Sequence, residues 1–417
     1  MEKSIAEGLT QTKPETAQVL EELVREGARK MLQAALEAEV AEHCAKYQHL
    51  RDAHDHQEVV RNGYQPERTI LTGAGAISIR RPRVDDRILS TRGEERFSSR
   101  ILPKFMRRAA SLDSLIPVLY LKGISSDDFP TALEAILGPD AKGLSATTVV
   151  RLKEVWEKEY EQWTKRDLSA KHYVYMWADG VYCNARLEDE RSCLLVIIGA
   201  DSLGNKELVA VSDGVRESTQ SWRELLLDLR ARALRYAPSL VVCDGGMGFQ
   251  AAVAEVWPST HIQRCWFHKM GNVLDKMPES LQGKARKMLL SQYMAPTKEE
   301  ALKAYGLFIE TFRDKYPKAV ECLVKDKEDL FTFYDFPSAH WIHLRTTNPI
   351  ESTFATVRLR QRRTKGNGTR KATLTMVYKL CKEAEKNWRR LRGFNLIPLV
   401  ESGVRFVNGE LVDEAIA

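Results

Sequence analysis

The sequence predicts a mixed α/β core that is interrupted by a helical segment and preceded by mainly helical regions with a small β-hairpin module. Short apolar stretches joined by turns predict three sequential strands, and two further stretches alternate with helical periodicity; they lie at 172–178, 193–200, 206–211, 240–243 and 261–264. The predicted order is β-β-β-α-β-α-β. Purely helical periodicity over 273–334 predicts the interruption, and a helix near Asn348 follows it.

Length and composition bound the class of protein. The chain has 417 residues, 43% of them hydrophobic, which is enough to bury more than one core. The longest apolar run, 193–200, is much shorter than the roughly 20 residues that a membrane-spanning helix needs, and the first residues lack a signal-peptide pattern. Seven cysteines without a Cys-x-x-Cys pair favour reduced thiols. We therefore expect a cytoplasmic protein with no membrane partner.

Charge is distributed unevenly along the chain. The net charge is only +6, and residues 1–60 are acidic, with 7 Lys and Arg against 12 Asp and Glu. Residues 61–108 carry 12 basic against 5 acidic side chains, and residues 358–392 carry 13 against 2. A solvated surface is the simple explanation of either band. Clustered basic residues are also the electrostatic signature of a protein that binds nucleic acid.

The first predicted elements are a helix and a β-hairpin. Apolar residues recur at helical spacing over 14–43, so this amphipathic helix should pack on the body of the protein or dimerise. Residues 61–85 switch to extended stretches, with a turn at 61–64 and another at 73–75. An Arg- and Ser-rich connector that could follow a DNA backbone completes the module. The module offers four candidate DNA-contacting residues: Arg61, Arg80, Arg81 and Arg83.

Residues 111–167 predict a helix-turn-helix-like DNA-binding domain. Helical periodicity at 115–121 is followed by a turn at Gly123, a cap at 126–128, a helix over 129–137 and a last helix capped by Ser145. The exposed face of the last helix would then carry Thr147, Thr148 and Arg151, which could reach bases or phosphates. An ordinary helical subdomain is the alternative.

Three acidic residues are candidate metal ligands. Asp179 and Asp244 each follow an apolar strand, so they should lie at the carboxyl edge of the sheet, where open α/β sheets bind ligands. Glu351 enters the helix that carries the second basic band. Each has a structural alternative, because Asp-Gly dipeptides form turns and Glu351 follows Asn348 at capping-box spacing. Together they favour a triad that holds paired divalent cations against a phosphodiester.

Further residues near these acids are candidates for supporting roles. Cys265 and His268 form a Cys-x-x-His element, but a zinc site would need a second pair of ligands, which is absent from the sequence. Arg358 lies about two helical turns after Glu351 and could hold a phosphate beside the metals. The same helical region supplies a cationic surface for DNA-backbone contacts, consisting of Arg360, Arg362, Arg363, Lys365, Arg370 and Lys371.

Four motifs carry a family resemblance. They are Ala-Asp-Gly-Val-Tyr at 178–182, Val-Cys-Asp-Gly at 242–245, Gln-Arg-Cys-Trp-Phe-His-Lys at 263–269 and Thr-Thr-Asn-Pro-Ile-Glu-Ser at 346–352, which continues to Arg358 and to the Lys-Gly pair at 365–366. With these motifs the chain resembles bacterial Mutator-type insertion-sequence transposases of the Asp-Asp-Glu class, which have an RNase H-like catalytic domain. The resemblance implies that Asp179, Asp244 and Glu351 bind the metals and that the helices between Asp244 and Glu351 form an all-helical insertion. It also implies that Cys265 and His268 lie beside the active site.

The function implied by the resemblance is that of a nucleoid-associated bacterial DNA transposase. Such an enzyme binds the terminal inverted repeats of its element and target DNA, and catalyses strand cleavage and strand transfer with two Mg²⁺ ions per site, for which Mn²⁺ should substitute. Pairing two DNA ends implies a homodimer or higher oligomer. A non-catalytic DNA-binding protein derived from a transposase is one alternative, and an RNase H-like nuclease or resolvase is another.

The expected domain organisation follows from these elements. It comprises an N-terminal helical segment (1–60), the basic hairpin module and connector (61–110), the helix-turn-helix-like domain (111–167), the first part of the RNase H-like core (168–272), the all-helical insertion (273–340), the second part of the core with the basic helix (341–395) and a C-terminal tail (396–417).

Overall fold

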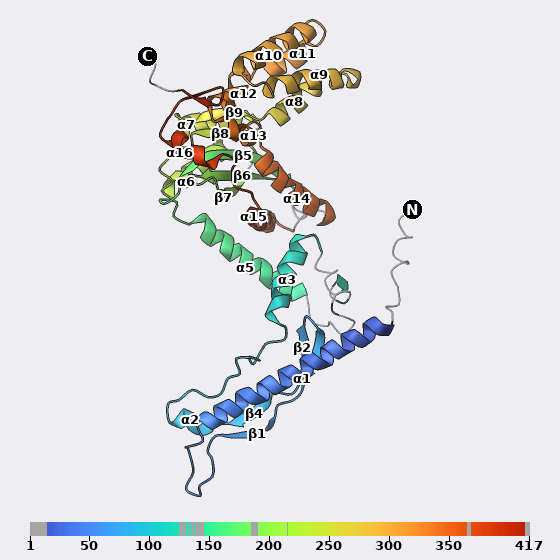
Figure 1. Cartoon of the computed structure of the whole chain (residues 1–417), viewed down its shortest axis with the longest axis vertical. Helices are drawn as coiled ribbons and strands as arrows, with labels where there is room; N and C mark the ends of the chain where they lie inside the picture. Colours follow the sequence, from blue (N-terminus) through green and yellow to red (C-terminus); the bar gives the residue numbers. More distant parts are fainter. Residues whose placement is uncertain are drawn as a thin grey trace. The chain divides into compact units, whose positions relative to one another are not determined.

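The computed structural model describes residues 15–124, 131–132, 134, 137, 146–184, 191–214, 216–364 and 368–412. The chain forms two compact units, Met1–Leu152 and Lys153–Ala417. The division between them falls inside helix α5 (Ala146–Thr164), before the boundary that the sequence predicts at 165–167. Figure 1 labels the elements of both units.

The first unit is built on one long helix. Helix α1 (Glu15–Lys46) packs on four short strands, which are β1 (Val60–Tyr64), β2 (Arg68–Thr72), β3 (Gly75–Ile79) and β4 (Pro82–Asp85). Strand β1 pairs antiparallel with β4, and β2 pairs antiparallel with β3. Leu36 of α1 packs against Ile70 and Ile79 in one apolar cluster, whereas Val40 belongs to a second cluster with Val84. The C-terminal half of α1 therefore supplies the core of this unit.

The hairpin module differs from the sequence prediction at its first turn. Residues 61–64, predicted as a turn, belong to β1, and the register with β4 shifts between Arg61 and Tyr64. Gly63 has a φ of 67° there, so the Asn-Gly pair makes a bulge within a paired strand. The remaining helices of this unit are α2 (Arg87–Thr91) and α3 (Ala110–Leu121).

The predicted helix-turn-helix is described only in part. Helix α3 covers its first segment and α5 its last. The expected cap at 126–128, most of the expected helix at 129–137 and the capping Ser145 lie outside the described residues. The backbone of Thr147 and Thr148 is helical, and Arg151 is exposed.

The second unit contains a five-stranded mixed sheet in the order β7-β6-β5-β8-β9. Strands β5 (Tyr173–Cys183), β6 (Ser192–Asp201) and β7 (Lys206–Gly214) are antiparallel neighbours. Strands β8 (Leu240–Cys243) and β9 (His261–Arg264) run parallel to β5 and have the bounds that the sequence predicts.

Helices cover both faces of this sheet (Figure 1). On one face, Met176 and Ala178 of β5 share a core cluster with residues of α6 (Thr219–Ala231) and α7 (Met247–Val256). The alternate residues of β5 point the other way, and the indole Nε1 of Trp177 donates to the His343 carbonyl at 2.9 Å. Helix α14 (Asn348–Thr364) contacts β5 and β6, and α15 (Arg370–Glu385) contacts β6 and β7. Because both faces are covered, β5 and β6 are buried almost throughout.

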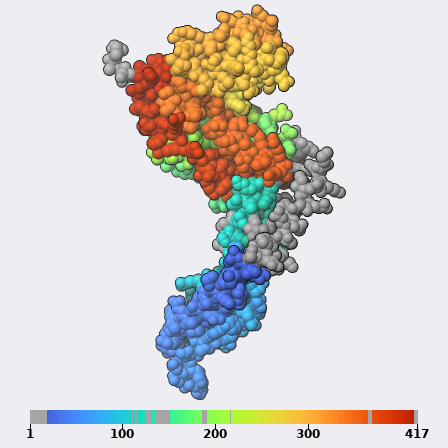
Figure 2. All heavy atoms as spheres, turned by 45° about the vertical axis from the view of Figure 1, so that its right-hand side comes forward, coloured from blue at the N-terminus to red at the C-terminus, as the bar shows by residue number. Residues whose placement is uncertain are grey.

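From residue 266 to residue 344 the secondary structure is entirely helical. Its helices are α8 (Trp266–Leu274), α9 (Glu279–Tyr293), α10 (Lys298–Phe312), α11 (Pro317–Val324), α12 (Lys327–Leu330), two 3-10 turns at Thr332–Asp335 and Ser338–His340, and α13 (Trp341–Leu344). Figure 2 shows most of this stretch, coloured yellow to orange, gathered into one lobe of the second unit. After α15 the chain adds a 3-10 turn (Phe394–Leu396), helix α16 (Ile397–Glu401) and the two-residue strands β10 (Phe406–Val407) and β11 (Glu410–Leu411).

All seven cysteines are free thiols, as their spacing predicts. Among the described residues, no helix is both long enough and apolar enough to cross a membrane.

Candidate active site

Asp179 lies inside strand β5 rather than at its end. The sequence predicts that the strand stops at residue 178, but β5 continues to Cys183 because it stays paired with β6, where Asp179 faces Val196. On the other side its parallel neighbour β8 ends at Cys243, which pairs with Ala178. Asp179 is thus at the point where β8 stops, so that Asp244, the next residue after β8, can approach it.

Asp244 is held at the edge of the sheet by a tight turn. Its Oδ1 accepts a hydrogen bond from the Gly246 N–H at 2.9 Å. Gly245 has a φ of 85°, and a Cβ there would come within 2.0 Å of the Arg264 guanidinium. The Asp-Gly-Gly sequence therefore does form a turn, and the turn places the carboxylate.

Glu351 reaches the same region because the start of α14 is tied to the start of α8. The Thr347 N–H and hydroxyl both lie within hydrogen-bonding range of the Cys265 sulfur, at 3.3 and 3.4 Å. Glu351 then lies 3.0 Å from His268 Nε2 and accepts a hydrogen bond from Arg358 at 3.0 Å. The Asn348 N–H donates to the Thr346 hydroxyl, so it is not capped by Glu351.

The described acidic and histidine side chains form two groups with metal-binding geometry. Asp179, His268 and Glu351 each offer a ligand atom, and these atoms lie within 4.8 Å of one another; the same holds for Asp179, Glu217 and Asp244. Asp179 belongs to both groups. All three acids that the sequence singles out are thus brought together with His268.

Glu217 is the residue that sequence reasoning missed. It follows β7 by three residues and precedes the N-terminus of α6, where Ser218 is the N-cap residue. The signal was present, because an acid between a buried strand and a helix is the pattern that also marks Asp244. No other feature of the sequence around Glu217 distinguishes it from a surface glutamate.

The two carboxyls nearest the sheet are difficult to ionise together in the metal-free protein. Burial, reinforced by the charge of Asp244, raises the pKa of Asp179 to about 8. The same two causes raise the pKa of Glu217 to about 7. Only 6% of Asp179 is exposed to solvent, so water screens the repulsion poorly. A divalent cation would relieve both effects.

The group of Asp179, His268 and Glu351 carries a compensating positive charge. Hydrogen bonds to Cys265 and Glu351 raise the pKa of His268 to about 10. In return, His268 and then Arg358 hold the pKa of Glu351 at about 2. Burial works against ionisation of Cys265, but its hydrogen bonds with His268 and Thr347 leave the pKa of the thiol below its ordinary value. This group therefore joins a cation to the Glu351 carboxylate.

A buried ion-pair network links Arg264 and Lys269, which flank the start of α8, to Asp326. Asp326, just before α12, accepts from Arg264 at 3.0 Å and from Lys269 at 2.5 Å. The side chains of Arg264 and Lys269 are only 4% and 3% exposed, so both cations depend on this one carboxylate. Lys269 also donates to the Cys322 carbonyl. The network therefore holds the first turn of α8, which carries His268, in place.

The predicted DNA-contacting residues fall into several classes. The exposed ones are Arg61, Arg80, Arg83, Arg151, Arg362 and Arg363, and Arg81 is half-buried. Arg360 is only 3% exposed and so is not part of the surface. Arg370 pairs with Asp213, and Lys371 pairs with Glu157 and Glu161. Lys365 lies outside the described residues, and Arg358 is engaged with Glu351.

The two aromatic residues of the Cys-x-x-His element differ in exposure. Trp266 is fully buried, stacks on Tyr293 and donates its indole N–H to the Leu330 carbonyl at 2.7 Å. Its neighbour Phe267 is 66% exposed, with its ring 5.8 Å from that of His268. Of the two aromatic residues of this element, Phe267 is therefore the one whose ring is accessible.

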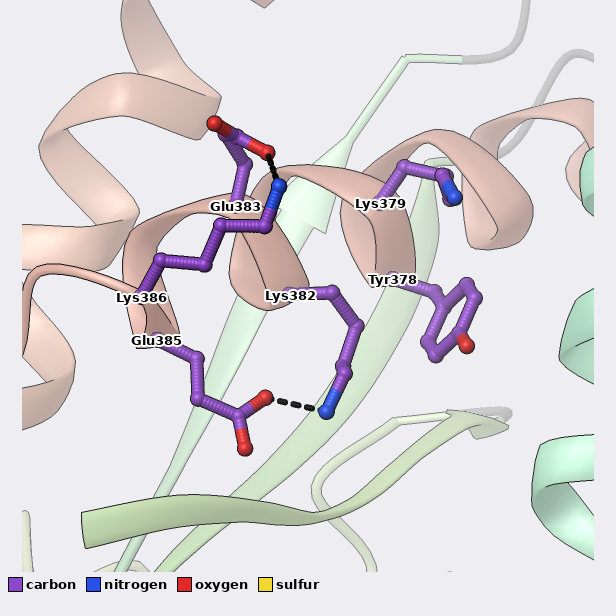
Figure 3. Close-up of a pocket in the computed structure, with 6 residues that line it drawn as sticks. All are labelled: Tyr378, Lys379, Lys382, Glu383, Glu385 and Lys386. Atoms are coloured by element: carbon purple, nitrogen blue, oxygen red, sulfur yellow. Dashed lines mark hydrogen bonds and ion pairs between the residues drawn. The ribbon is translucent and has the colours of Figure 1, made fainter.

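A pocket of about 450 Å³ lies on α15 and is separate from the carboxylates in its lining residues. Figure 3 shows two of its lysines paired with glutamates of the same helix, Lys382 with Glu385 and Lys386 with Glu383. Lys379 pairs with Glu159 of α5. Because each of its lysines is paired with a glutamate, this pocket offers no unpaired lysine that would select an anionic ligand.

Comparison with known proteins gives a consistent set of relatives. Residues 1–391 match the family described as "Transposase, Mutator family". The chain is 48% identical over 302 residues, 72% of its length and 93% of the relative, to the transposase for insertion sequence element IS6120 of Mycolicibacterium smegmatis. It is 46% identical to the transposase for IST2 of Acidithiobacillus ferrooxidans, over 67% of this chain and 94% of the relative. The transposase for ISRM5 of Rhizobium meliloti is 25% identical over 88% of both chains.

Proposed function

Because the chain belongs to the Mutator family of transposases, we propose that it cleaves DNA at the ends of an insertion sequence and joins those ends to target DNA. The observation that supports this most strongly is the approach of Asp179, Asp244 and Glu351 from distant parts of the sequence to one edge of the sheet. We also assign the second unit to the RNase H-like class. The mixed sheet and the long helical stretch between Asp244 and Glu351 support that assignment.

The side chains at the site suit a hard divalent cation. The carboxylates supply oxygen ligands, which Mg²⁺ and Mn²⁺ prefer, and the sulfur of Cys265 is buried and engaged by Thr347. Asp179, which belongs to both groups, would be shared between two ions. Bound Mg²⁺ would stabilise charge on phosphate oxygens and lower the pKa of an attacking hydroxyl. His268 and Arg358 would keep Glu351 ionised and correctly turned.

Substitution of the three acids tests the catalytic proposal. Asp179→Asn, Asp244→Asn and Glu351→Gln should each abolish Mg²⁺-dependent cleavage of a DNA fragment that carries an element end. Binding of the same fragment in EDTA should remain within about threefold of wild type, since these side chains are not expected to hold DNA without metal. Loss of binding in all three variants would make the residues structural, and retained cleavage would exclude them from catalysis.

The products of the wild-type reaction separate the alternatives. A transposase should convert a pre-cleaved end with a free 3′-hydroxyl into a joined product with target DNA. A nuclease or resolvase of the same fold would release cut ends without joining them. A non-catalytic DNA-binding protein would shift the fragment in a gel and leave every phosphodiester intact.

We propose that the exposed arginines of the β module and of α14 contact DNA. Arg61, Arg80 and Arg83 lie exposed within the first unit, and Arg362 and Arg363 within the second. Such contacts release counterions, so affinity should fall steeply as salt rises.

We further propose that the protein acts as a homodimer or higher oligomer, with α1 as the contact. Helix α1 exposes large apolar side chains at helical spacing between residues 19 and 31, among them Leu20, Leu23 and Met31, which are 61%, 67% and 70% exposed. A second copy of this helix is the partner that matches such a stripe. Light scattering of the full chain should show a dimer that Leu23→Glu converts to monomer; an unchanged mass would exclude α1 as the contact.

A further inference from the structure

Glu217 is a fourth acid at the edge of the sheet. Strands β5 and β7 both run antiparallel to β6, so their carboxyl ends meet at the same edge. Glu217 follows the end of β7 and comes from the opposite side of β5 to Asp244. It thereby closes a ring of carboxylate oxygens with Asp179 and Asp244, all within 4.8 Å.

Two glycines make this position possible. A Cβ on Gly180 would lie 2.4 Å from the carboxyl carbon and Oε1 of Glu217, and a Cβ on Gly248 would lie 2.4 Å from the Glu217 carbonyl oxygen. Both distances are far shorter than a carbon contact tolerates. The Glu217 carboxylate therefore rests directly on the backbone next to Asp179, and its own backbone rests on the first turn of α7. A surface glutamate would need neither approach.

Among the described residues Glu217 lacks an ion-pair partner of its own; the charge of His268 and a hydrogen bond from Tyr182 only partly offset the burial and the repulsion by Asp244 that raise its pKa. No described lysine, arginine or histidine forms an ion pair with it, whereas Glu351 has His268 and Arg358. Asp179, almost completely buried, accepts a hydrogen bond from the neighbouring Gly180 N–H. Half-buried carboxylates with like-charged neighbours are costly unless a cation lies among them, and oxygen ligands in this number suit Mg²⁺ or Mn²⁺.

We propose that Glu217 is a metal ligand, which together with Asp179 and Asp244 holds one of the two cations, while Asp179 and Glu351 hold the other. The inference rests on the proposed function, because it extends the same site from three acids to four. It assigns Glu217 a direct role in the site rather than a place in the loop before α6.

Calorimetric titration of the full chain with Mn²⁺, without DNA, tests this assignment. Glu217→Gln keeps the shape of the side chain and removes its charge. It should weaken the tighter Mn²⁺ site at least tenfold and reduce the rise in melting temperature that Mn²⁺ causes. The metal-free variant should melt no lower than wild type, because a repelling charge has been removed. Glu224→Gln, an exposed glutamate on α6, is the matched control and should bind Mn²⁺ like wild type.

Cleavage gives a second readout. Glu217→Gln should need at least tenfold more Mg²⁺ for half-maximal cleavage and recover partly at high Mg²⁺, unlike Asp179→Asn. Mn²⁺ binding equal to wild type in Glu217→Gln but lost in Asp179→Asn would overturn the assignment of Glu217 and leave the proposed function standing. Unchanged binding in both variants would instead overturn the proposed metal site. If Glu217→Gln lowers both stability and affinity, Glu217→Asp decides: restored Mn²⁺ binding supports a ligand, and none overturns it.

Discussion

Replacing Asp179 by Asn should remove much of the pH dependence that the carboxylate cluster gives to the stability of the metal-free protein. The pKa of Asp179 is raised from 3.8 to about 8 by burial and by Asp244. A carboxyl with a raised pKa stabilises the fold fully only below its unfolded pKa, and this stability is lost as pH rises through the folded value. Wild type should therefore lose stability between pH 4 and pH 8, whereas an amide at this position stays neutral.

The size of the effect follows from the shift and from the distances. Each pKa unit corresponds to about 1.4 kcal/mol, so a shift of about four units sets an upper bound of about 6 kcal/mol over the whole titration range. Two like charges 4.8 Å apart, the upper limit for the ligand atoms of this group, repel by roughly 3.5 kcal/mol at an effective dielectric constant of about 20. We expect the stability of Asp179→Asn relative to wild type to rise by about 2–4 kcal/mol between pH 5 and pH 9, because part of the full shift is already expressed at pH 5. The Asn oxygen can still accept the Gly180 hydrogen bond.

Urea unfolding in EDTA, followed by tryptophan fluorescence, measures this difference. All eight tryptophans lie in Lys153–Ala417, so the signal reports the second unit alone. Asp275→Asn, an exposed acid at the end of α8, controls for the loss of a negative charge. His268, whose raised pKa also costs stability as pH climbs towards 10, contributes to both proteins. Stability curves for Asp179→Asn and wild type that stay parallel from pH 5 to pH 9 would refute the reasoning.

Three further predictions follow from the surroundings of the site. Asp326→Ala should lower the free energy of unfolding by about 3–5 kcal/mol, because it leaves the cations of Arg264 and Lys269 buried without their counter-ion; urea unfolding measures it. Phe267→Ala should weaken binding of single-stranded element ends by about 1–3 kcal/mol through loss of base stacking, with stability unchanged; fluorescence anisotropy measures it. Arg363→Ala should make the slope of log affinity against log salt shallower by about 0.9 on duplex DNA, if it contacts one phosphate.

Each of these predictions has a control and a contradicting result. Asp335→Ala removes an exposed partner of Lys298 and should lower the free energy of unfolding by less than about 1 kcal/mol. If Asp326→Ala lowers it by no more than this, the buried network does not stabilise the fold. Tyr236→Ala, another exposed aromatic of the second unit, should leave single-strand binding intact. Arg235 is an exposed arginine outside the basic bands, so Arg235→Ala should leave the salt slope at the wild-type value. If Arg363→Ala also has the wild-type slope, Arg363 does not contact a phosphate.

The sequence predicts the strands that are bounded by local signals. Strands β8 and β9 have the expected limits because each is a short apolar run between turn residues. The end of β5 depends instead on its pairing with β6. Local sequence signals therefore could not predict that Asp179 lies inside the strand. In the same way, the Asn-Gly turn expected at 61–64 became a bulge once β4 was available to pair with β1.

The burial of charged residues is the second feature that the sequence prediction did not capture. Arg360 continues the buried stripe of Ile350, Phe354 and Val357 along α14, so the helical spacing alone could have excluded it from the surface. For Glu217, in contrast, the local sequence could not have predicted its position. Its contact with Gly180 joins two segments that share no local pattern, and only the antiparallel arrangement of β5, β6 and β7 brings them together.

The glycines beside the acids have a genetic consequence. Gly180, Gly245 and Gly248 each lie against an atom of a neighbouring segment that leaves no room for a methyl group. In a saturation screen for transposition, substitutions at these positions should score as null alleles alongside those of the acids, although a glycine has no side chain to offer to metal or DNA.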